Sequence, residues 1–574
     1  DLRDRDGITQ VTFDRSEAPE AFEVGSRARS EYVLAVRGRV RDRGEQRNDK
    51  IPTGAIEVLA LEAEILNTAE PPIFPIAEEV NALEETRLAY RYLDLRRPNL
   101  QRNLKMRAQI YHHTRNYLAE NGFLEIETPF MVKYTPGGAR NFLVPARFHP
   151  GKFYALAESP QLFKQLLMVA GYDRYFQIVR CFRDEDLRGD RQPEFTQVDI
   201  EMSFVTQDDV FRVCEGLVFR LWKEVLGIDL RERYPDGTFP RMKYEESMRL
   251  YGNDKPDLRF GLPHVDLTEL TVQHLGGGIA LLEPLARKFA DGEYRLDLPE
   301  EIVKAMRVPA EHALSRKQVD ELEGFVKQMG AKGLGRAKVG PNGEWTQSPF
   351  AKQITDAYRT AVNEAVGARE GDLILLMFGP EAMVHTAMAN LRVHLGKKLG
   401  YIPETGAGGK YELLWVVDPP LFERGEDGGW VAAHHPFTRP HDDSVELIET
   451  DPGKVLCYRY DLVLNGVEIA GGSIRLHDPN VQRRVFAALG LSEAEAKEKF
   501  SFLLDALRYG APPHGGIAFG LDRLVMLMTG ASSLRDVIAF PKTARGNDLM
   551  TGAPGDADAK HLRELKIRST AAEQ

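Results

Sequence analysis

Cysteine, long apolar runs and an excess of positive charge are all lacking in this chain. Its 574 residues include only three cysteines, Cys181, Cys214 and Cys457, which lie far apart and form no CxxC pair. A disulfide framework and a zinc ribbon are therefore excluded, and the composition fits the reducing cytoplasm. No run approaches the roughly 18 apolar residues of a membrane-spanning helix, so the sequence predicts no membrane span.

The charge and length of the chain set wider limits. A formal net charge of −11 argues against a nucleic-acid binder only at face value, because an acidic chain can carry local basic faces. The hydrophobic fraction of 43% is ample for packed cores, and the length predicts about three or four domains. The chain opens with DLRDRDGITQVTF, inside a strand pattern and without Met, so we expect that an N-terminal segment is missing.

The most informative stretch is a predicted hairpin over residues 176–204. Two runs rich in aromatic and β-branched residues, 176–185 and 194–204, flank a polar loop. Side chains alternate along a strand, so the second run places three polar residues on one face: Gln197, Asp199 and Glu201. The same hairpin contains arginines, and the guanidinium group of an arginine can bind a phosphate or a carboxylate with two hydrogen bonds. The hairpin is therefore either a surface with ion pairs or a site for phosphate and a zwitterion.

The run FRDEDLRGDRQPEFTQVD in this hairpin resembles motif 2 of the class II aminoacyl-tRNA synthetases, in the form found in bacterial-type aspartyl-tRNA synthetases. A predicted helix over 100–121 and the run GFLEIETPFM, which ends its strand at Pro129, resemble motif 1, which forms the dimer interface in the family. The run GIAFGLDRL resembles motif 3. The resemblance spans essentially the whole chain. It implies an α+β fold, with an antiparallel catalytic sheet flanked by helices.

The resemblance also implies a domain order. Short predicted strands at 8–13, 32–40 and 55–61 suggest a small barrel, similar to the family's OB-fold anticodon-binding domain, with Gln10 on the tRNA-facing strand. From about 265 the catalytic motifs stop, and they resume near 411. The expected segments are an OB-fold at 1–66, a linker at 67–95, the catalytic domain at 96–264 and 406–555, an inserted α+β (GAD-type) domain at 265–405, and a tail at 556–574.

The resemblance implies an aspartate site. The run SPQLFKQ looks like the family's helix whose Gln and Lys hold the amino acid, and HHPFTRP looks like its histidine pair. Lys164 and Arg475 would bind the side-chain carboxylate of aspartate, while Asp199 and Gln161 would bind its ammonium group. The implied set is Gly137, Gln161, Lys164, Arg183, Gln197, Asp199, His434, His435 and Arg475.

An ATP site follows from the same resemblance, with Arg183, Arg523 and Glu468 as catalytic residues. The implied set is Arg183, Asp184, Glu185, Arg191, Gln192, Glu468, Gly520, Leu521, Asp522 and Arg523. Asn465-Gly466 is a strong hairpin signal, and a two-residue turn pairs 464 with 467 and 463 with 468. Asp461 and Glu468 then share a face and can hold Mg²⁺. We also expect a β-bulge at 470–472 that turns Arg475 to this face.

Three positions depart from the family pattern. Gly137, in the run TPGGAR, stands where the family has a glutamate that contacts the substrate ammonium. Asn141 stands where the family has Asp, and Ala470 where it has Gly. Losing a carboxylate beside a cation removes a contact of about 1.5–3 kcal/mol. The expected activity is ATP-dependent ligation of L-aspartate to tRNA-Asp by a homodimer. The alternatives are an enzyme that also charges tRNA-Asn and an impaired tRNA-binding paralogue.

Overall fold

The computed structural model describes residues 1–134, 140–187, 191–312, 314–402, 409–425 and 428–570. The chain divides into two compact units, one of residues 1–102 with 549–551 and one of 103–548 with 552–574. In the described part, no helix has both the length and the apolar character that crossing a membrane requires.

The first unit holds a small sheet in the order β3-β5-β4. Its long strands, β4 (Val33–Asp42) and β5 (Ile56–Asn67), are antiparallel, whereas β3 (Val11–Thr12) pairs with β5 in parallel over two residues. β1 (Leu2–Arg3) and β2 (Ile8–Thr9) form a separate ribbon. The strand positions agree with the sequence pattern, but helix α1 (Pro19–Arg27) was not predicted. Because β3 is so short, the described sheet stays open, and the OB-fold barrel stays a prediction.

The second unit is built on an eight-stranded sheet in the order β12-β18-β21-β22-β23-β11-β10-β6. Its two edge pairs, β12–β18 and β10–β6, are parallel, and the other pairs are antiparallel. The strands are β6 (Leu124–Glu125), β10 (Arg174–Phe182), β11 (Glu194–Ser203), β12 (Arg241–Lys243), β18 (Leu413–Val417), β21 (Arg459–Leu464), β22 (Val467–Ile474) and β23 (His514–Gly520). The predicted hairpin is confirmed as β10–β11.

Helices cover one face of this sheet because their apolar residues recur at helical spacing. In α6 (Gln207–Leu221), Val210, Cys214, Leu217 and Leu221 are buried against the strands. Leu524, Val525 and Met528 of α15 (Leu521–Thr529) and Ile110 of α4 (Pro98–Glu120) join the same core. The opposite face of the central strands carries polar residues, as the site requires.

A second sheet, in the order β13-β14-β17-β15-β16, separates β12 from β18 in the sequence, although these two strands pair. Alternate residues of β14 (Glu301–Val308) face two different cores: Val303 and Ala305 face one, and Ile302 and Met306 face the other. Such alternation is expected of a strand that is buried on both sides. The other strands are β13 (His264–Asp266), β15 (Gly335–Val339), β16 (Trp345–Thr346) and β17 (Leu373–Pro380).

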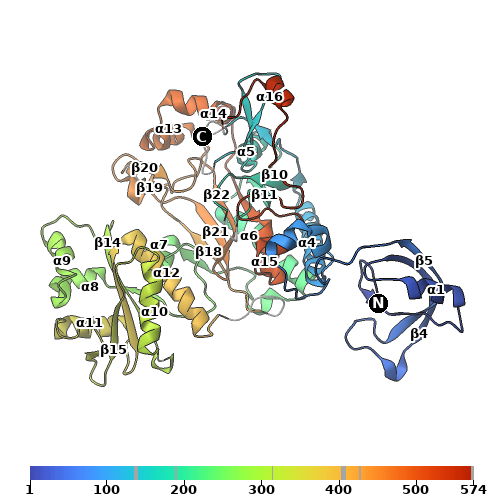
Figure 1. The fold of residues 1–574 in the computed structure, drawn as a ribbon. Coiled ribbons are helices and arrows are strands. Elements are labelled where there is room, and N and C mark those ends of the chain that lie inside the picture. The colour runs from blue at the N-terminus through green and yellow to red at the C-terminus, as the bar shows by residue number, and fades with distance from the viewer. Residues whose placement is uncertain (135–139, 188–190, 313, 403–408, 426–427, 571–574) are drawn as a thin grey trace. The chain divides into compact units, whose positions relative to one another are not determined.

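The helices of this region therefore lie in two layers, one on each face of the second sheet (Figure 1). On one face lie α8 (Thr268–Gln273), α9 (Glu283–Ala290) and α11 (Asp356–Val366). On the other lie α10 (Arg316–Lys327) and α12 (Glu381–Lys398).

The remaining elements are short. A three-stranded sheet contains β7 (Met131–Val132), β8 (Leu143–Pro145) and β9 (Phe153–Leu156), and a ribbon contains β19 (Phe422–Arg424) and β20 (Trp430–Ala432). The other α-helices are α2 (Glu84–Ala89), α3 (Arg91–Asp94), α5 (Gln161–Val169), α7 (Tyr244–Tyr251), α13 (Pro479–Ala488), α14 (Glu493–Leu507) and α16 (Ala559–Leu565). All three cysteines are free and buried.

Candidate active site

A cavity of about 1210 Å³ lies over the centre of the eight-stranded sheet. Its lining comes from β11, β22 and β23, which are neighbours in the sheet, and from α5 and the segment before β21. The lining includes most residues that the sequence singled out: Gln161, Lys164, Arg183, Glu185, Arg191, Gln192, Gln197, Asp199, His434, His435, Glu468, Arg475, Gly520, Asp522 and Arg523. Residues more than 300 positions apart in sequence thus meet in one place.

Two cations and two carboxylates form a buried network in this cavity. Lys164 Nζ lies 2.6 Å from Asp199 Oδ1 and 3.2 Å from Glu201 Oε2. Arg475 donates to Glu201 through Nε at 2.9 Å and through Nη2 at 3.0 Å. Lys164 is only 1% exposed, because it lies on the buried side of α5 together with Met168. Glu201 therefore joins the two cations that the sequence assigned to the aspartate site.

The network shifts the protonation of its acids in opposite directions. Burial raises the pKa of Asp199, although Lys164 opposes the effect. Burial also acts to raise the pKa of Glu201, but Arg475 and Lys164 outweigh it and lower the pKa to about 2. Glu201 is therefore ionised at neutral pH and holds both cations in place.

The two adjacent histidines border the same network. His435 Nε2 lies 3.3 Å from Arg475 Nη1, and its Nδ1 accepts the backbone N–H of Phe437 at 3.2 Å. Burial and then Arg475 lower the pKa of His435 well below its ordinary value. Burial and Arg459 lower the pKa of His434 to about 3. Both rings are therefore neutral at neutral pH and act as polar, uncharged groups.

The hairpin β21–β22 carries the predicted carboxylate pair. Leu464 pairs with Val467 and Val463 with Glu468, as predicted from the Asn465-Gly466 turn. The register then shifts, and Leu462 pairs with Ala470. The extra residue is Ile469, so the bulge exists but lies just before the predicted 470–472. Its effect is the expected one, since Arg475 reaches the cavity.

The pair of carboxylates fits a divalent cation. A Cβ on Gly471 would lie 2.7 Å from Asp461 Oδ1 and 3.0 Å from Glu468 Oε1, so both oxygens flank one point. Burial and the neighbouring Glu468 raise the pKa of Asp461 to about 7, although Arg459 opposes them. Among the described residues, no group of three or more His, Cys, Asp or Glu could hold a metal. A pair suits Mg²⁺, which commonly takes one or two carboxylates and completes its shell with phosphates and water.

Arg183 and Arg523 lie at the predicted phosphate end of the cavity. The Arg183 guanidinium stacks 5.0 Å from the Phe195 ring, and its buried Nε donates to no atom of the residues that the structure describes. Arg523 Nη1 donates to the backbone oxygen of Glu468 at 3.2 Å. Near Arg183, Arg191 pairs with Glu185 at 3.2 Å. Arg183, Arg191 and Arg523 thus all line this end of the cavity.

Four of the predicted ATP-binding residues have side chains that are buried in the core or bonded to other protein groups. Leu521 is fully buried in the apolar core, so its side chain is not at the cavity. The carboxylate of Asp184 pairs with Arg140 at 3.2 Å. Asp522 pairs with Arg107 of α4 at 2.6 Å and accepts the backbone N–H of Thr196 at 2.8 Å. Gln192 exchanges two hydrogen bonds with the backbone of Lys542. The Asp522 and Gln192 side chains thus tie elements together.

The two remaining predicted residues are Gly137 and Gln10. Gly137 is outside the described residues. Gln10, in the first unit, donates to Glu57 at 3.4 Å, and Glu57 also pairs with Arg41 at 2.6 Å and Arg43 at 3.0 Å. Arg41 of β4 and Arg43, which follows this strand, thus share a carboxylate partner on β5.

Sequence reasoning left Glu201 out of the site. The alternation of side chains along a strand had placed Glu201 on the same face as Gln197 and Asp199, and this signal was sufficient to include Glu201 in the site. Side-chain alternation within one strand does not predict the contacts of Glu201 with Lys164 and Arg475, because these contacts join β11 to α5 and to the segment after β22.

Comparisons with known proteins agree on one family. The family described as "tRNA synthetases class II (D, K and N)" matches residues 83–544. The aspartate–tRNA(Asp/Asn) ligase of Anaeromyxobacter dehalogenans (strain 2CP-C) is 64% identical over 571 residues, covering 99% of this chain and 92% of that protein. The protein of the same name from Nitratidesulfovibrio vulgaris (strain Hildenborough) is 52% identical over 570 residues, covering 99% and 89%.

Solved structures resemble the chain in fold. The asparaginyl-tRNA synthetase from Pyrococcus horikoshii complexed with asparaginyl-adenylate has a TM-score of 0.54 at 18% identity, covering 94% of this chain and 90% of that one. A putative aspartyl-tRNA synthetase from Leishmania major Friedlin has a TM-score of 0.55 at 18% identity, covering 94% and 86%.

Proposed function

This chain belongs to the class II tRNA synthetases of the D, K and N type, and we propose that its cavity joins L-aspartate to ATP as aspartyl-adenylate. The chain is an enzyme that ligates aspartate to tRNA. The observation that carries the proposal is the buried network of Lys164, Asp199, Glu201 and Arg475 beside the arginines at the phosphate end.

The network complements an amino acid with an acidic side chain. Lys164 and Arg475 offer donors to the side-chain carboxylate, while Asp199 and Gln161 receive the ammonium group. Gln197 lies beside Asp199 on β11, and the neutral His434 and His435 close this side of the cavity without adding charge. An asparagine side chain would leave two cations facing a neutral amide, which favours aspartate.

The phosphate end suits ATP. Arg183 binds the α-phosphate, and Arg523 lies along the triphosphate and the adenine. Glu185, Arg191 and Gly520 complete this end. A carboxylate oxygen of aspartate attacks the α-phosphorus, the bond to the bridging oxygen breaks, and pyrophosphate leaves. Asp461 and Glu468 would hold Mg²⁺, which supplies charge neutralisation at the phosphates. The chain's own groups act by position and electrostatics.

A terminal ribose hydroxyl of tRNA-Asp then attacks the carbonyl carbon of the adenylate, the mixed-anhydride bond breaks, and AMP leaves. The relatives at 64% and 52% identity are named as aspartate–tRNA(Asp/Asn) ligases, which favours the alternative that tRNA-Asn is charged too. We also assign tRNA binding to the first unit, including Gln10, in an OB-fold domain of residues 1–66, and we place the enzyme in the cytoplasm. Residues 265–405 form an inserted domain in this proposal.

A homodimer is supported by an apolar surface around the motif 1 strand. Exposed side chains there are Leu124 (51%), Phe130 (44%), Met131 (56%), Leu143 (55%) and Phe153 (45%). Pro129, the predicted interface residue, is exposed beside Phe130. Patches of this kind on one protomer mark surfaces that a partner covers.

Aspartate-dependent exchange of pyrophosphate into ATP tests the proposal. We expect exchange with the unaltered protein, and its absence, with recovery in a Gly137→Glu variant, would instead support the impaired paralogue suggested by Gly137 and Ala470. Charging of purified tRNA-Asp and tRNA-Asn then decides the tRNA range.

A further inference from the structure

Two buried cations, one on the second sheet and one on a helix that packs against it, hold residues 248–261, here called the 248–261 segment. Lys304 of β14 donates from Nζ to the backbone oxygens of Met248 at 2.6 Å and Arg249 at 3.0 Å. Arg392 of α12 donates from Nη2 to the backbone oxygens of Asp257 at 2.9 Å, Phe260 at 2.8 Å and Gly261 at 2.8 Å. Both cations thus fix the path of this backbone.

Arg392 is suited to this task. Its side chain is only 2% exposed and lies over two rings, 4.6 Å from the Tyr251 centroid and 4.1 Å from that of Phe260. Burial lowers the pKa of Arg392 to about 10, so the group is still charged at neutral pH. Its planar fork donates to the backbone oxygens of Asp257, Phe260 and Gly261, with both Nε and Nη2 reaching Gly261.

The segment meets the turn of the β21–β22 hairpin. Gly466 has a φ of +81°, and a Cβ at this position would lie 3.0 Å from the Cβ of Asp257. The Asp257 carboxylate is itself held by Arg259, through Nε at 3.0 Å and Nη2 at 2.7 Å. The backbone of the 248–261 segment therefore approaches the β21–β22 turn so closely at Asp257 that the turn requires glycine at position 466.

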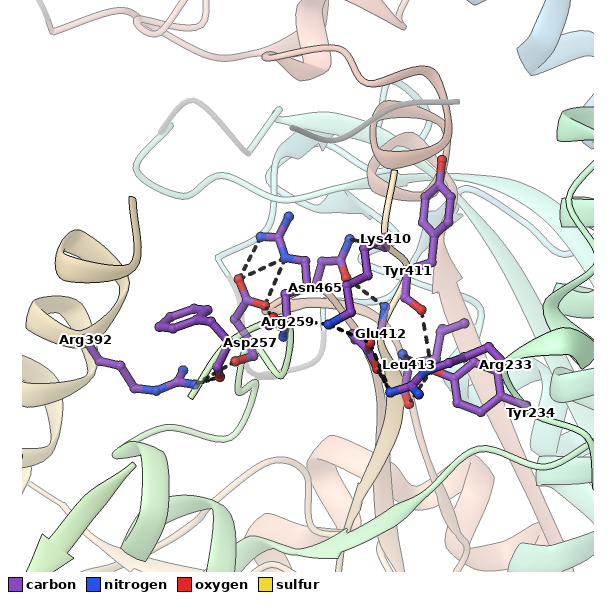
Figure 2. Close-up of polar contacts among 11 residues, drawn as sticks. Arg233, Tyr234, Asp257, Arg259, Arg392, Lys410, Tyr411, Glu412, Leu413 and Asn465 are labelled. Atoms are coloured by element: carbon purple, nitrogen blue, oxygen red, sulfur yellow. Dashed lines mark hydrogen bonds and ion pairs between the residues drawn. The ribbon is translucent and has the colours of Figure 1, made fainter. Parts of the chain in front are cut away.

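The other side of the turn is held by residues 410–412, which follow the second sheet in sequence. Asn465 accepts the Glu412 backbone N–H at 2.9 Å and donates to the Lys410 backbone oxygen at 2.9 Å. Lys410 Nζ also donates to the backbone oxygen of Arg259 at 3.3 Å. Figure 2 shows Arg392, Asp257, Arg259 and Lys410 leading to Asn465. The turn therefore lies between the two chain segments that connect the second sheet to the first.

This turn is next to the ATP end of the cavity. Glu468 follows it by two residues and pairs with Val463, and its backbone oxygen accepts from Arg523. A displaced turn would move the Glu468 carboxylate and the acceptor of Arg523 together.

We propose that Arg392 and the 248–261 segment are positioning elements that set the Asn465-Gly466 turn, and through it Glu468 and Arg523, for ATP. The second sheet thereby acts on the ATP end of the cavity without touching it. This inference rests on the proposed function, which assigns ATP to that end.

Gly466→Ala and Arg392→Met test the inference from its two ends. The first adds a methyl group against Asp257, and the second removes the donors to the segment while keeping an apolar side chain between the rings. Arg392→Lys keeps the charge and should recover part of the loss. Gly367→Ala is the matched control, because Gly367 also has a positive φ of +62° but no atom lies within 4 Å of its added Cβ.

Two readouts separate positioning from simple destabilisation. Calorimetric titration with ATP and Mg²⁺ gives the Kd of the whole protein, and pyrophosphate exchange gives KM for ATP and for aspartate. Gly466→Ala and Arg392→Met should weaken ATP binding about tenfold and leave KM for aspartate within about twofold. Gly367→Ala should leave both unchanged.

The inference is overturned if Gly466→Ala binds ATP like the unaltered protein, or if both KM values rise equally. If Arg392→Met does not fold, Gly466→Ala and Arg392→Lys still decide the question. Failure of the unaltered protein to exchange pyrophosphate would overturn the proposed function, a result distinct from unchanged ATP affinity in an active Gly466→Ala variant.

Discussion

Replacing Glu201 by glutamine removes the charge that joins Lys164 to Arg475, and the cost can be worked from the structure. Arg475 and Lys164 lower the pKa of Glu201 to about 2, against an ordinary 4.5, so the folded state favours the ionised form. At about 1.4 kcal/mol per pKa unit, this is about 3 kcal/mol. Removing one partner of a buried ion pair costs a similar amount, about 3–5 kcal/mol.

The sign of the pH dependence follows from the lowered pKa. Stabilisation by Glu201 is fully present above pH 4.5 or so, and it is lost as the pH falls toward about 2. At neutral pH the Glu201→Gln variant should therefore show the whole loss. A local opening that becomes about 3 kcal/mol easier makes amide exchange faster by about a hundredfold. Hydrogen exchange on peptides from β11 measures this directly.

Glu215→Gln is the matched control, because Glu215 is also buried but forms no ion pair with the described residues. Burial outweighs the effect of Arg241, which acts to lower the pKa of Glu215. Its Oε1 accepts from the Phe239 backbone N–H at 2.9 Å and from Trp415 Nε1 at 2.9 Å. Burial raises the pKa of Glu215, so its charge is a cost at neutral pH, and a glutamine oxygen can keep both hydrogen bonds. This variant should exchange no faster than the unaltered protein. Equal acceleration in both variants, or none in Glu201→Gln, would refute the electrostatic reasoning.

Lys164→Met should raise KM for aspartate roughly 10- to 150-fold, the loss of one charge-assisted hydrogen bond, and leave KM for ATP within about twofold. Pyrophosphate exchange at varied aspartate measures this, and an equal rise in both KM values would contradict the assignment. Leu143→Asp should convert the proposed dimer to a monomer, because it places a charge in the exposed apolar surface, and sedimentation that stays dimeric would exclude this surface. Arg107→Met leaves the buried carboxylate of Asp522 without its cation and should lower stability by about 3–5 kcal/mol, seen as a lower midpoint of thermal unfolding. An unchanged midpoint would show that the Thr196 hydrogen bond suffices.

Much of the local architecture was predictable. The β10–β11 hairpin, the Asn465-Gly466 turn and its first two pairs follow from strand alternation and turn chemistry, which act over a few residues. The motif resemblance gave the family, the α+β fold and the aspartate–tRNA ligase activity, all of which the comparisons confirm. The bulge was expected one position late. The alternation of side chains shows that an extra residue is needed to turn Arg475 to the cavity face, but it does not show which residue this is.

The apolar residues of helix α5 show where a local hydrophobic pattern fails to predict which side chains are buried. Hydrophobicity predicts a buried stripe of Leu162, Phe163, Leu166, Leu167 and Ala170. The structure instead buries Lys164, Gln165 and Met168, while Leu162 and Leu166 are partly buried against the cluster that contains Phe437 and Phe500. Lys164 faces inward because Asp199 and Glu201 on a strand 35 or more residues away compensate its charge.

The sequence by itself determined the family, the order of the elements and the residue types that the cavity gathers. Only the tertiary structure decided how they are paired: Glu201 with both cations, Asp522 with Arg107, and the turn at Gly466 with Asp257. Alternation, helical period and turn preference are properties of neighbouring residues, so the sequence displays them. Ion pairs and close backbone approach depend on which distant elements pack together and on how deeply they are buried, and those are set by the fold as a whole.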